Sequence, residues 1–180
     1  MKIILSKYSK EQVKKASLVK AIFLDVDGVL TNGKIIYDDA GKEIKQFNVR
    51  DGQITQYVKK AGIIVGVISG RESAAVTKRC VELKLDFCHQ GIIDKGTTFE
   101  KLVEHYKLKS KEVAFVGDDI NDLPVFKRAG FCICPADALE YIREKVDLVT
   151  YSKGGAGVFR EVADLVLSAR GEMEEILRTG

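Results

Sequence analysis

Residues 63–68, Ile-Ile-Val-Gly-Val-Ile, form a nearly pure aliphatic run, which limits the possible folds of this chain more than any other feature. A strand with one wet face alternates apolar and polar residues, whereas a strand covered on both faces is apolar throughout. Similar short runs occur further along, separated by stretches with helical spacing. They lie at residues 21–24, 87–88, 113–116, 131–134 and 148–149. The alternation predicts one α/β domain over residues 1–180, a doubly wound, Rossmann-like parallel sheet with helices on both faces.

The expected helices fill the gaps between these runs. Two strand-like pieces, 34–37 and 43–47, flank the sequence Asp-Asp-Ala-Gly at 38–41, which is typical of a β-hairpin. This hairpin is the only insertion of any size in the alternating pattern. Helices are expected at 10–18, at 53–60 with Gly62 after its end, from the turn at 69–72 up to Leu83, and at 97–106, 123–129, 137–144 and 158–168.

Composition excludes several classes of protein. With 46% hydrophobic and 31% charged residues, the chain has the makeup of an ordinary soluble protein. A net charge of +3 without a basic cluster does not indicate nucleic acid. The four cysteines form no C-x-x-C pair, which favours reduced thiols over zinc. No apolar run has membrane-spanning length, and residues 1–20 are too charged for a secretory signal. We therefore expect a cytoplasmic protein with no nucleic-acid or membrane partner.

Polar residues follow several predicted strands at the edge where an α/β sheet binds its ligands. The carboxylates suit a hard cation, while the hydroxyl, the lysine and helix N-terminal amides suit an anion. Taken singly, Asp-x-Asp and Gly-Asp-Asp are also typical of turns, and a lone lysine is usually a solvated surface residue. The ordered set predicts a site for phosphate and magnesium. Its members are Asp25, Asp27, Ser69, Lys95, Asp118 and Asp119.

Four motifs in this order resemble the haloacid dehalogenase-like phosphatase superfamily. They are Asp-Val-Asp-Gly-Val-Leu-Thr at 25–31, Ile-Ser-Gly-Arg at 68–71, the isolated Lys95, and Gly-Asp-Asp-Ile-Asn-Asp at 117–122. The first and fourth are specific, and the other two are weak alone.

Three further segments are similar to the 3-deoxy-D-manno-octulosonate 8-phosphate phosphatase family, and this resemblance covers nearly the whole chain. The segments are Phe-Asn-Val-Arg-Asp-Gly at 47–52, Gly-Gly-Ala-Gly at 154–157 and Arg160-Glu161. The resemblance implies a capless fold. Ser69 stands where many members carry threonine, which keeps the hydroxyl.

The resemblance implies Mg²⁺-dependent hydrolysis of a phosphate monoester through an aspartyl phosphate. Asp25 would be the nucleophile, and Asp27 the general acid and base, a role that requires a raised pKa. Asp25, Asp118 and the main-chain carbonyl of Asp27 would hold Mg²⁺. Ser69 and Lys95 would bind the phosphate oxygens.

Two acidic residues of the fourth motif have supporting roles in this interpretation. Asp119 is expected to support the loop behind the metal ligands. Asp122 precedes Leu123-Pro124, and we expect it to cap the helix that begins there.

The substrate implied by the resemblance is an acidic sugar phosphate, 3-deoxy-D-manno-octulosonate 8-phosphate. Guanidinium groups match its carboxylate, although by spacing alone Arg79 is an exposed helix residue. The expected substrate contacts are Asp27, Asn48, Val49, Arg50, Asp51, Gly52, Gln56, Arg71, Arg79 and Lys95.

Two alternatives remain open. One is a phosphatase for another acidic sugar phosphate, such as a nine-carbon sialic-acid-type 9-phosphate. The other is a non-catalytic phosphatase-like oligomerisation module, against which the intact Asp25 and Asp27 argue.

The resemblance also implies a homotetramer in which four hairpins form a central barrel. Ile35, Tyr37, Ile44 and Phe47 give the hairpin more apolar side chains than a two-stranded ribbon buries by itself. The glycine loop at 154–157 is expected to be flexible and to lie close to a ligand. The residues after Arg170 are expected to reach toward a neighbouring subunit's site. The alternative is a hairpin packed on its own domain, with a frayed tail.

Overall fold

Six parallel strands form the central sheet in a computed structural model, which describes residues 2–179. The strand order is β5-β4-β1-β6-β7-β8, so that β1 lies inside the sheet and the chain winds outward from it in both directions. The strands are β1 (Ala21–Leu24), β4 (Ile64–Ile68), β5 (Phe87–His89), β6 (Val113–Val116), β7 (Phe131–Cys134) and β8 (Leu148–Val149). The predicted doubly wound α/β fold is confirmed.

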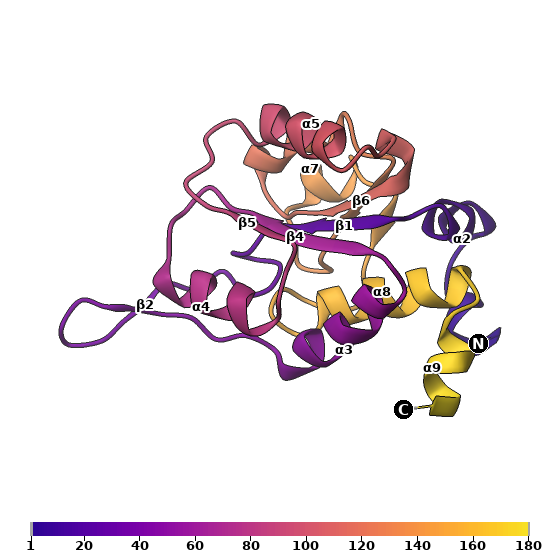
Figure 1. Cartoon of the computed structure of the whole chain (residues 1–180). Coiled ribbons are helices and arrows are strands. Elements are labelled where there is room, and N and C mark those ends of the chain that lie inside the picture. Colours follow the sequence, from indigo (N-terminus) through magenta and orange to yellow (C-terminus); the bar gives the residue numbers. More distant parts are fainter. Residues whose placement is uncertain (1, 180) are drawn as a thin grey trace.

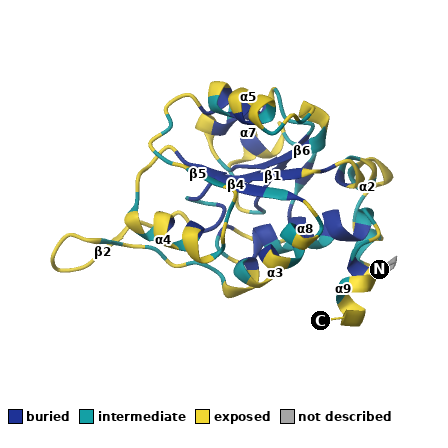
Figure 2. Ribbon diagram, in the orientation of Figure 1, coloured by how far each residue is buried: buried dark blue, intermediate teal, exposed yellow. Residues whose placement is uncertain are grey.

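Helices cover both faces of this sheet (Figure 1). Strand β1 contributes Ile22 and Leu24 to one apolar cluster and Ala21 and Phe23 to the other, which explains its unbroken hydrophobicity. The sheet is accordingly buried throughout its middle (Figure 2). One face carries α3 (Val49–Lys60), α4 (Ala74–Glu82) and α8 (Val158–Ala169), and the other carries α5 (Lys95–His105) and α7 (Glu140–Arg143). The remaining helices are α1 (Lys2–Leu5), α2 (Lys10–Ser17), α6 (Leu123–Phe126), α9 (Met173–Thr179) and the 3₁₀ turns η1 (Ser110–Glu112) and η2 (Ile120–Asp122).

Helix α3 begins four residues earlier than the sequence predicts. Asn48 is its N-cap and accepts a hydrogen bond from the Arg50 amide at 2.9 Å. Gly52, a residue type typical of turns, lies inside the helix. A Cβ there would stand 2.4 Å from Arg79 Nη2, so the glycine gives Arg79 room to lie across the helix.

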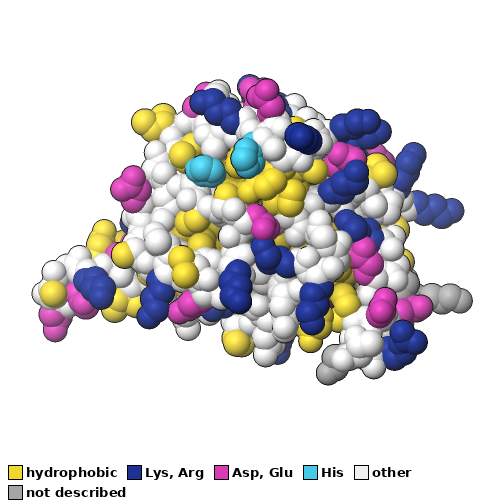
Figure 3. Space-filling model, in the orientation of Figure 1, with side chains coloured by type: hydrophobic (Ala, Val, Ile, Leu, Met, Phe, Trp, Pro, Cys, Tyr) yellow, Lys and Arg dark blue, Asp and Glu magenta, His cyan; other side chains and the backbone are white. Residues whose placement is uncertain are grey.

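The hairpin projects from the body of the molecule (Figure 1). Its antiparallel strands, β2 (Ile36–Tyr37) and β3 (Glu43–Ile44), have only two residues each and are shorter than predicted. Ile35, Tyr37 and Ile44 are 54%, 60% and 48% exposed. Figure 3 shows the hairpin's hydrophobic side chains among charged ones. Phe47, which the sequence groups with these residues, packs against its own domain's core instead.

The glycine loop at 154–157 packs against backbone, which corrects the expectation of a flexible segment, while its closeness to a ligand stays a prediction. The Gly155 amide donates to the Val29 carbonyl at 3.0 Å. A Cβ on Gly154 would stand 2.1 Å from the Gly28 carbonyl oxygen. The missing side chains allow residues 154–155 to lie directly on the loop that follows β1.

The segment after Arg170 forms helix α9, which the sequence did not predict. Met173 is buried in the core cluster that includes α8 residues, and Ile176 packs against the same cluster. The first part of the tail thus packs on its own chain, and its reach toward a neighbouring subunit stays a prediction. Among residues 2–179, no helix has the length and apolar character needed to cross a bilayer.

Candidate active site

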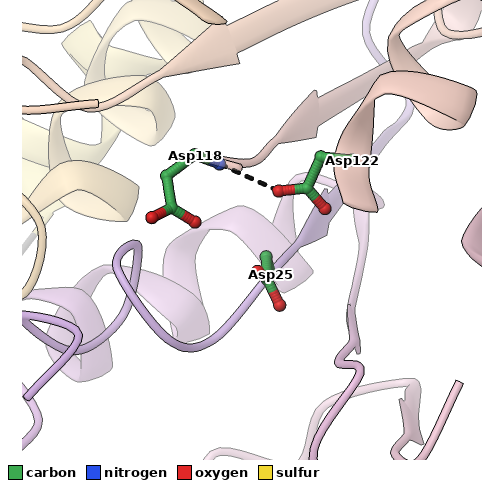
Figure 4. A group of neighbouring side chains, drawn as sticks. All are labelled: Asp25, Asp118 and Asp122. Atoms are coloured by element: carbon green, nitrogen blue, oxygen red, sulfur yellow. Dashed lines mark hydrogen bonds between the residues drawn. The ribbon is translucent and has the colours of Figure 1, made fainter. Parts of the chain in front are cut away.

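Three carboxylates meet where the winding of the sheet reverses, between β1 and β6. Asp25 directly follows β1, Asp118 lies two residues beyond β6, and Asp122 ends the short turn η2. One oxygen from each lies within 4.8 Å of the others (Figure 4). The sheet topology therefore brings together residues that are up to 97 positions apart, 122 − 25, in the sequence.

Lys95 lies between two of these carboxylates and is fully buried, with 0% exposure. Its Nζ is 3.0 Å from Asp25 Oδ1 and 2.7 Å from Asp122 Oδ1. Helix α5 fixes its position, because Lys95 is the first residue after the N-cap Asp94. Burial disfavours the charged amine, but the two carboxylates outweigh burial and raise the pKa of Lys95 above its usual value.

Asp122 differs from its prediction as a helix cap. It makes no side-chain hydrogen bond to the first turn of α6, although Pro124 does lie in that turn. Instead its buried Oδ2 accepts from the amides of Asp118 (2.9 Å) and Asp119 (3.3 Å), while Oδ1 holds Lys95. Asp122 is thus a site residue that the sequence interpretation missed. One signal could have identified it: a lysine placed at a buried site needs acidic partners. Lys95 therefore required a carboxylate in addition to Asp25.

Burial and mutual repulsion favour the protonated forms of Asp25 and Asp118, even with Lys95 beside the cluster. Burial, with repulsion from neighbouring carboxylates, raises the pKa of Asp118 to about 8. Burial and the Asp122 charge raise the pKa of Asp25 to about 7. A divalent ion would remove this penalty by favouring the charged forms.

The donor set of this cluster fits a hard cation. Asp118 Oδ1 is buried and has no hydrogen-bond partner among the described residues. All three side chains offer carboxylate oxygens, the ligands that Mg²⁺ prefers. Gly28 is also part of the arrangement, because a Cβ at this position would overlap the Asp118 carboxylate.

Asp27 lies in a separate set of contacts. The Thr31 hydroxyl donates to its Oδ1 at 3.3 Å, and Lys45 Nζ lies 2.5 Å from the same oxygen. Arg71 Nε is 3.7 Å from Asp27 Oδ2. Lys45 is not among the predicted site residues, because its contact depends on how the hairpin folds back across 18 residues.

Ser69 directly follows β4, at the sheet edge that also carries Asp25. Its side chain is buried, and its Oγ accepts a hydrogen bond from the Arg71 amide at 3.3 Å. The guanidinium of Arg71 is half-exposed and donates to Glu43 Oε1 at 2.6 Å. Ser69 thus follows the strand that pairs with β1, and the Arg71 guanidinium lies beside Asp27 and Glu43.

The other predicted substrate contacts are spread along helix α3 and its surroundings. Arg79 is half-buried, stacks over Phe47 with its Cζ 5.9 Å from the ring centre, and donates to the Asn48 carbonyl at 3.4 Å. Asp51 is buried, and its Oδ1 accepts from the Arg160 amide at the start of α8; burial raises the pKa of Asp51 to about 6.

The remaining predicted site residues are exposed. Arg50 faces a hollow that Tyr8, Tyr151 and Arg160 also line, rather than the three carboxylates. Asp119 accepts from the Ile120 amide at 2.7 Å. Val49 and Gln56 lie on the surface of α3.

Comparison with known proteins identifies the family. A family model described as haloacid dehalogenase-like hydrolase matches residues 85–162. The 3-deoxy-D-manno-octulosonate 8-phosphate phosphatase KdsC of Escherichia coli K12 is 38% identical over 167 residues, which cover 93% of this chain and 89% of that protein. The chain belongs to the KdsC family of haloacid dehalogenase-like hydrolases.

Solved structures of KdsC relatives extend this similarity to the fold. The Moraxella catarrhalis phosphatase, in complex with magnesium, phosphate and KDO, is 37% identical, has a TM-score of 0.92, and is matched over 96% of this chain and 99% of its own. The Yersinia pestis phosphatase is 34% identical with a TM-score of 0.91, over 93% and 90%. The predicted family, the phosphomonoesterase class and the magnesium cofactor are confirmed.

Proposed function

We propose that the chain hydrolyses 3-deoxy-D-manno-octulosonate 8-phosphate to the free sugar acid and inorganic phosphate, a step of lipopolysaccharide precursor synthesis. The observation that carries this proposal is the arrangement of the buried Asp25 and Lys95 with the partly buried Asp118, in a chain whose relatives are phosphatases for this substrate. A carboxylate nucleophile, a cation and a metal-binding acid at one sheet edge are the parts that phosphoryl transfer requires.

In the first step, an Asp25 oxygen attacks phosphorus in line, and the bond from phosphorus to the sugar oxygen breaks. Asp27 gives its proton to that oxygen, so the sugar leaves as a neutral alcohol. In the second step, Asp27 takes a proton from water, the water oxygen attacks phosphorus, and the bond from phosphorus to Asp25 breaks. Lys95 and Ser69 stabilise the charge on the non-bridging oxygens.

Asp25, Asp118 and the main-chain carbonyl of Asp27 are the groups that would hold Mg²⁺. Bound Mg²⁺ would offset the repulsion between the anionic nucleophile and the anionic phosphate. Asp122 forms an ion pair with Lys95 and accepts a hydrogen bond from the Asp118 amide. These contacts keep the lysine charged and fix its position.

For the sugar, we propose that Arg71 and Arg79 bind the carboxylate through their paired donors. Both guanidinium groups lie beside the base of the hairpin, since Arg71 contacts Glu43 and Arg79 stacks on Phe47. Asn48, Val49, Arg50, Asp51, Gly52 and Gln56 complete the proposed contact set, with the exposed Val49, Arg50 and Gln56 available to a neighbouring subunit.

We also propose a homotetramer, located in the cytoplasm. The exposed Ile35, Tyr37 and Ile44 form an apolar surface on a two-stranded ribbon, and pairing of such ribbons would bury this surface and their unpaired edges.

The function is tested by measuring phosphate release from a panel of sugar phosphates, with Mg²⁺ and with EDTA. We expect the octulosonate phosphate to have the highest kcat/KM, activity to vanish in EDTA, and Ca²⁺ to inhibit. The Asp25→Asn variant should fold normally and lose turnover, with Asp119→Asn as a matched control. Preference for a nine-carbon acidic sugar phosphate would favour the alternative substrate. Turnover by Asp25→Asn above about a few per cent of wild type would contradict the aspartyl-phosphate mechanism.

A further inference from the structure

Lys45 is a lysine buried at the base of an otherwise exposed hairpin. Its side chain is 3% exposed, whereas lysine ordinarily keeps its amine in water. Nζ lies 2.5 Å from Asp27 Oδ1 and 3.3 Å from Glu43 Oε1, so one amine joins a site carboxylate to a hairpin carboxylate. A buried cation with two acidic partners has a defined position.

The contacts of Asp27 fix its carboxylate from both sides. Lys45 and the Thr31 hydroxyl contact Oδ1, and Arg71 approaches Oδ2 at 3.7 Å. Arg71 is itself held by Glu43 at 2.6 Å. Glu43 therefore connects the two cations that flank Asp27, and strand β3 is tied to Asp27 through four ion pairs.

We propose that Lys45 is a positioning residue, which holds the Asp27 carboxylate in the orientation needed for proton transfer. The inference rests on the proposed function, because it takes Asp27 as the general acid and base. Proton transfer requires hydrogen-bond distance between the acid and the leaving oxygen. Without Lys45, the contacts left to Asp27 are the longer ones to Thr31 and Arg71, and its carboxylate rotates away from that oxygen.

A purely structural role for Lys45, as an anchor of the hairpin, makes a different prediction. Loss of an anchor would slow every reaction of the site alike. Loss of a positioned acid slows only the steps that need a proton. A sugar alkoxide needs one in order to leave, whereas p-nitrophenolate is a stable anion at neutral pH and leaves without one.

The experiment compares Lys45→Met, Lys45→Arg and the exposed hairpin control Lys42→Met in the full-length, Mg²⁺-loaded protein. For Lys45→Met we expect kcat on the sugar phosphate to fall about tenfold or more, with KM changed less than about twofold. The pre-steady-state burst of p-nitrophenolate from p-nitrophenyl phosphate should keep its wild-type rate. Steady-state turnover should fall, because the second step needs Asp27 as base. Lys45→Arg should recover most of the lost turnover, and Lys42→Met should match wild type.

An equal fall of burst rate and sugar-phosphate turnover in Lys45→Met, or unchanged turnover, would overturn the proposal. Mass and melting temperature, measured on the same samples, identify a variant that has lost its assembly. If the wild type releases phosphate from no sugar phosphate, the proposed substrate is wrong. The comparison of burst with steady state on p-nitrophenyl phosphate then still decides the role of Lys45.

Discussion

The carboxylate of Asp118 fills the space that a side chain on residue 28 would need. A Cβ on Gly28 would lie 1.9 Å from Asp118 Oδ2 and 2.5 Å from its Cγ, and the Gly28 backbone has a φ of +89°. The glycine of the first motif therefore shapes the acidic cluster from the opposite side of the site.

Gly28→Ala is predicted to displace Asp118 and to weaken magnesium activation about tenfold or more, as loss of support around a metal ligand typically does. The positive φ adds a strain of about 1 kcal/mol. Gly41→Ala is the matched control, since Gly41 also has a positive φ (+74°) and nothing lies within 4 Å of the position that its Cβ would take. Titration of activity with Mg²⁺ measures the effect. Equal Mg²⁺ requirements in both variants would contradict the prediction.

Stability without metal is predicted to fall as pH rises. The folded-state pKa of Asp118, about 8, is above the ordinary value for aspartate, so this group stabilises the fold at low pH and loses that contribution as pH rises through about 8. Mg²⁺ binds the charged form, so the gap in melting temperature between Mg²⁺ and EDTA samples should widen from pH 6 to pH 9. Thermal unfolding at several pH values tests this. In Asp118→Asn the widening should become smaller, because only Asp25 then titrates against Mg²⁺ in this range. A gap that does not change with pH in the wild type would contradict the prediction.

Asp122→Asn is predicted to lower the free energy of unfolding by about 2 kcal/mol, because the buried Lys95 loses a charged partner. Turnover should fall with it, since Lys95 then pairs more closely with the nucleophile Asp25. Urea unfolding measures the first effect and phosphate release the second. Asp119→Asn is the control. Its side chain is exposed, and asparagine also caps the turn, so a change within about 0.5 kcal/mol is expected.

Ile35→Glu is predicted to give species smaller than a tetramer with reduced activity, because a charge on the exposed apolar side of the hairpin opposes its burial. Lys34→Glu, at the neighbouring exposed position, should leave the mass unchanged. Light scattering gives the masses. A wild-type mass equal to one chain, with full turnover, would exclude the proposed assembly. Phe47 is unsuitable for this test because it packs in the core of its own domain.

The sheet could be predicted because strands that are buried on both faces consist of unbroken apolar residues, as in residues 21–24 and 64–68. Asp25 and Asp118 could be placed together because parallel strands end at one edge. The start of α3 could not be predicted, because glycine is typical of turns and Gly52 lies in the first part of this helix. Its closeness to Arg79, which explains the glycine, is visible only in the folded chain. Lys45 and Asp122 were missed for a related reason. Their partners are set by how a hairpin and a short loop fold back, and no local pattern records this.

The contact between residues 154–155 and the loop at 28–32 has a consequence for the order in which this site is completed during synthesis. All of the proposed catalytic and metal-binding residues lie between positions 25 and 118, yet the loop carrying Asp27 receives its last backbone support from Gly154 and Gly155. A nascent chain that has emerged only to residue 150 already contains the whole reactive set but lacks the segment that packs on it. The site can therefore be completed only after residues 154 and 155 have emerged, late in translation.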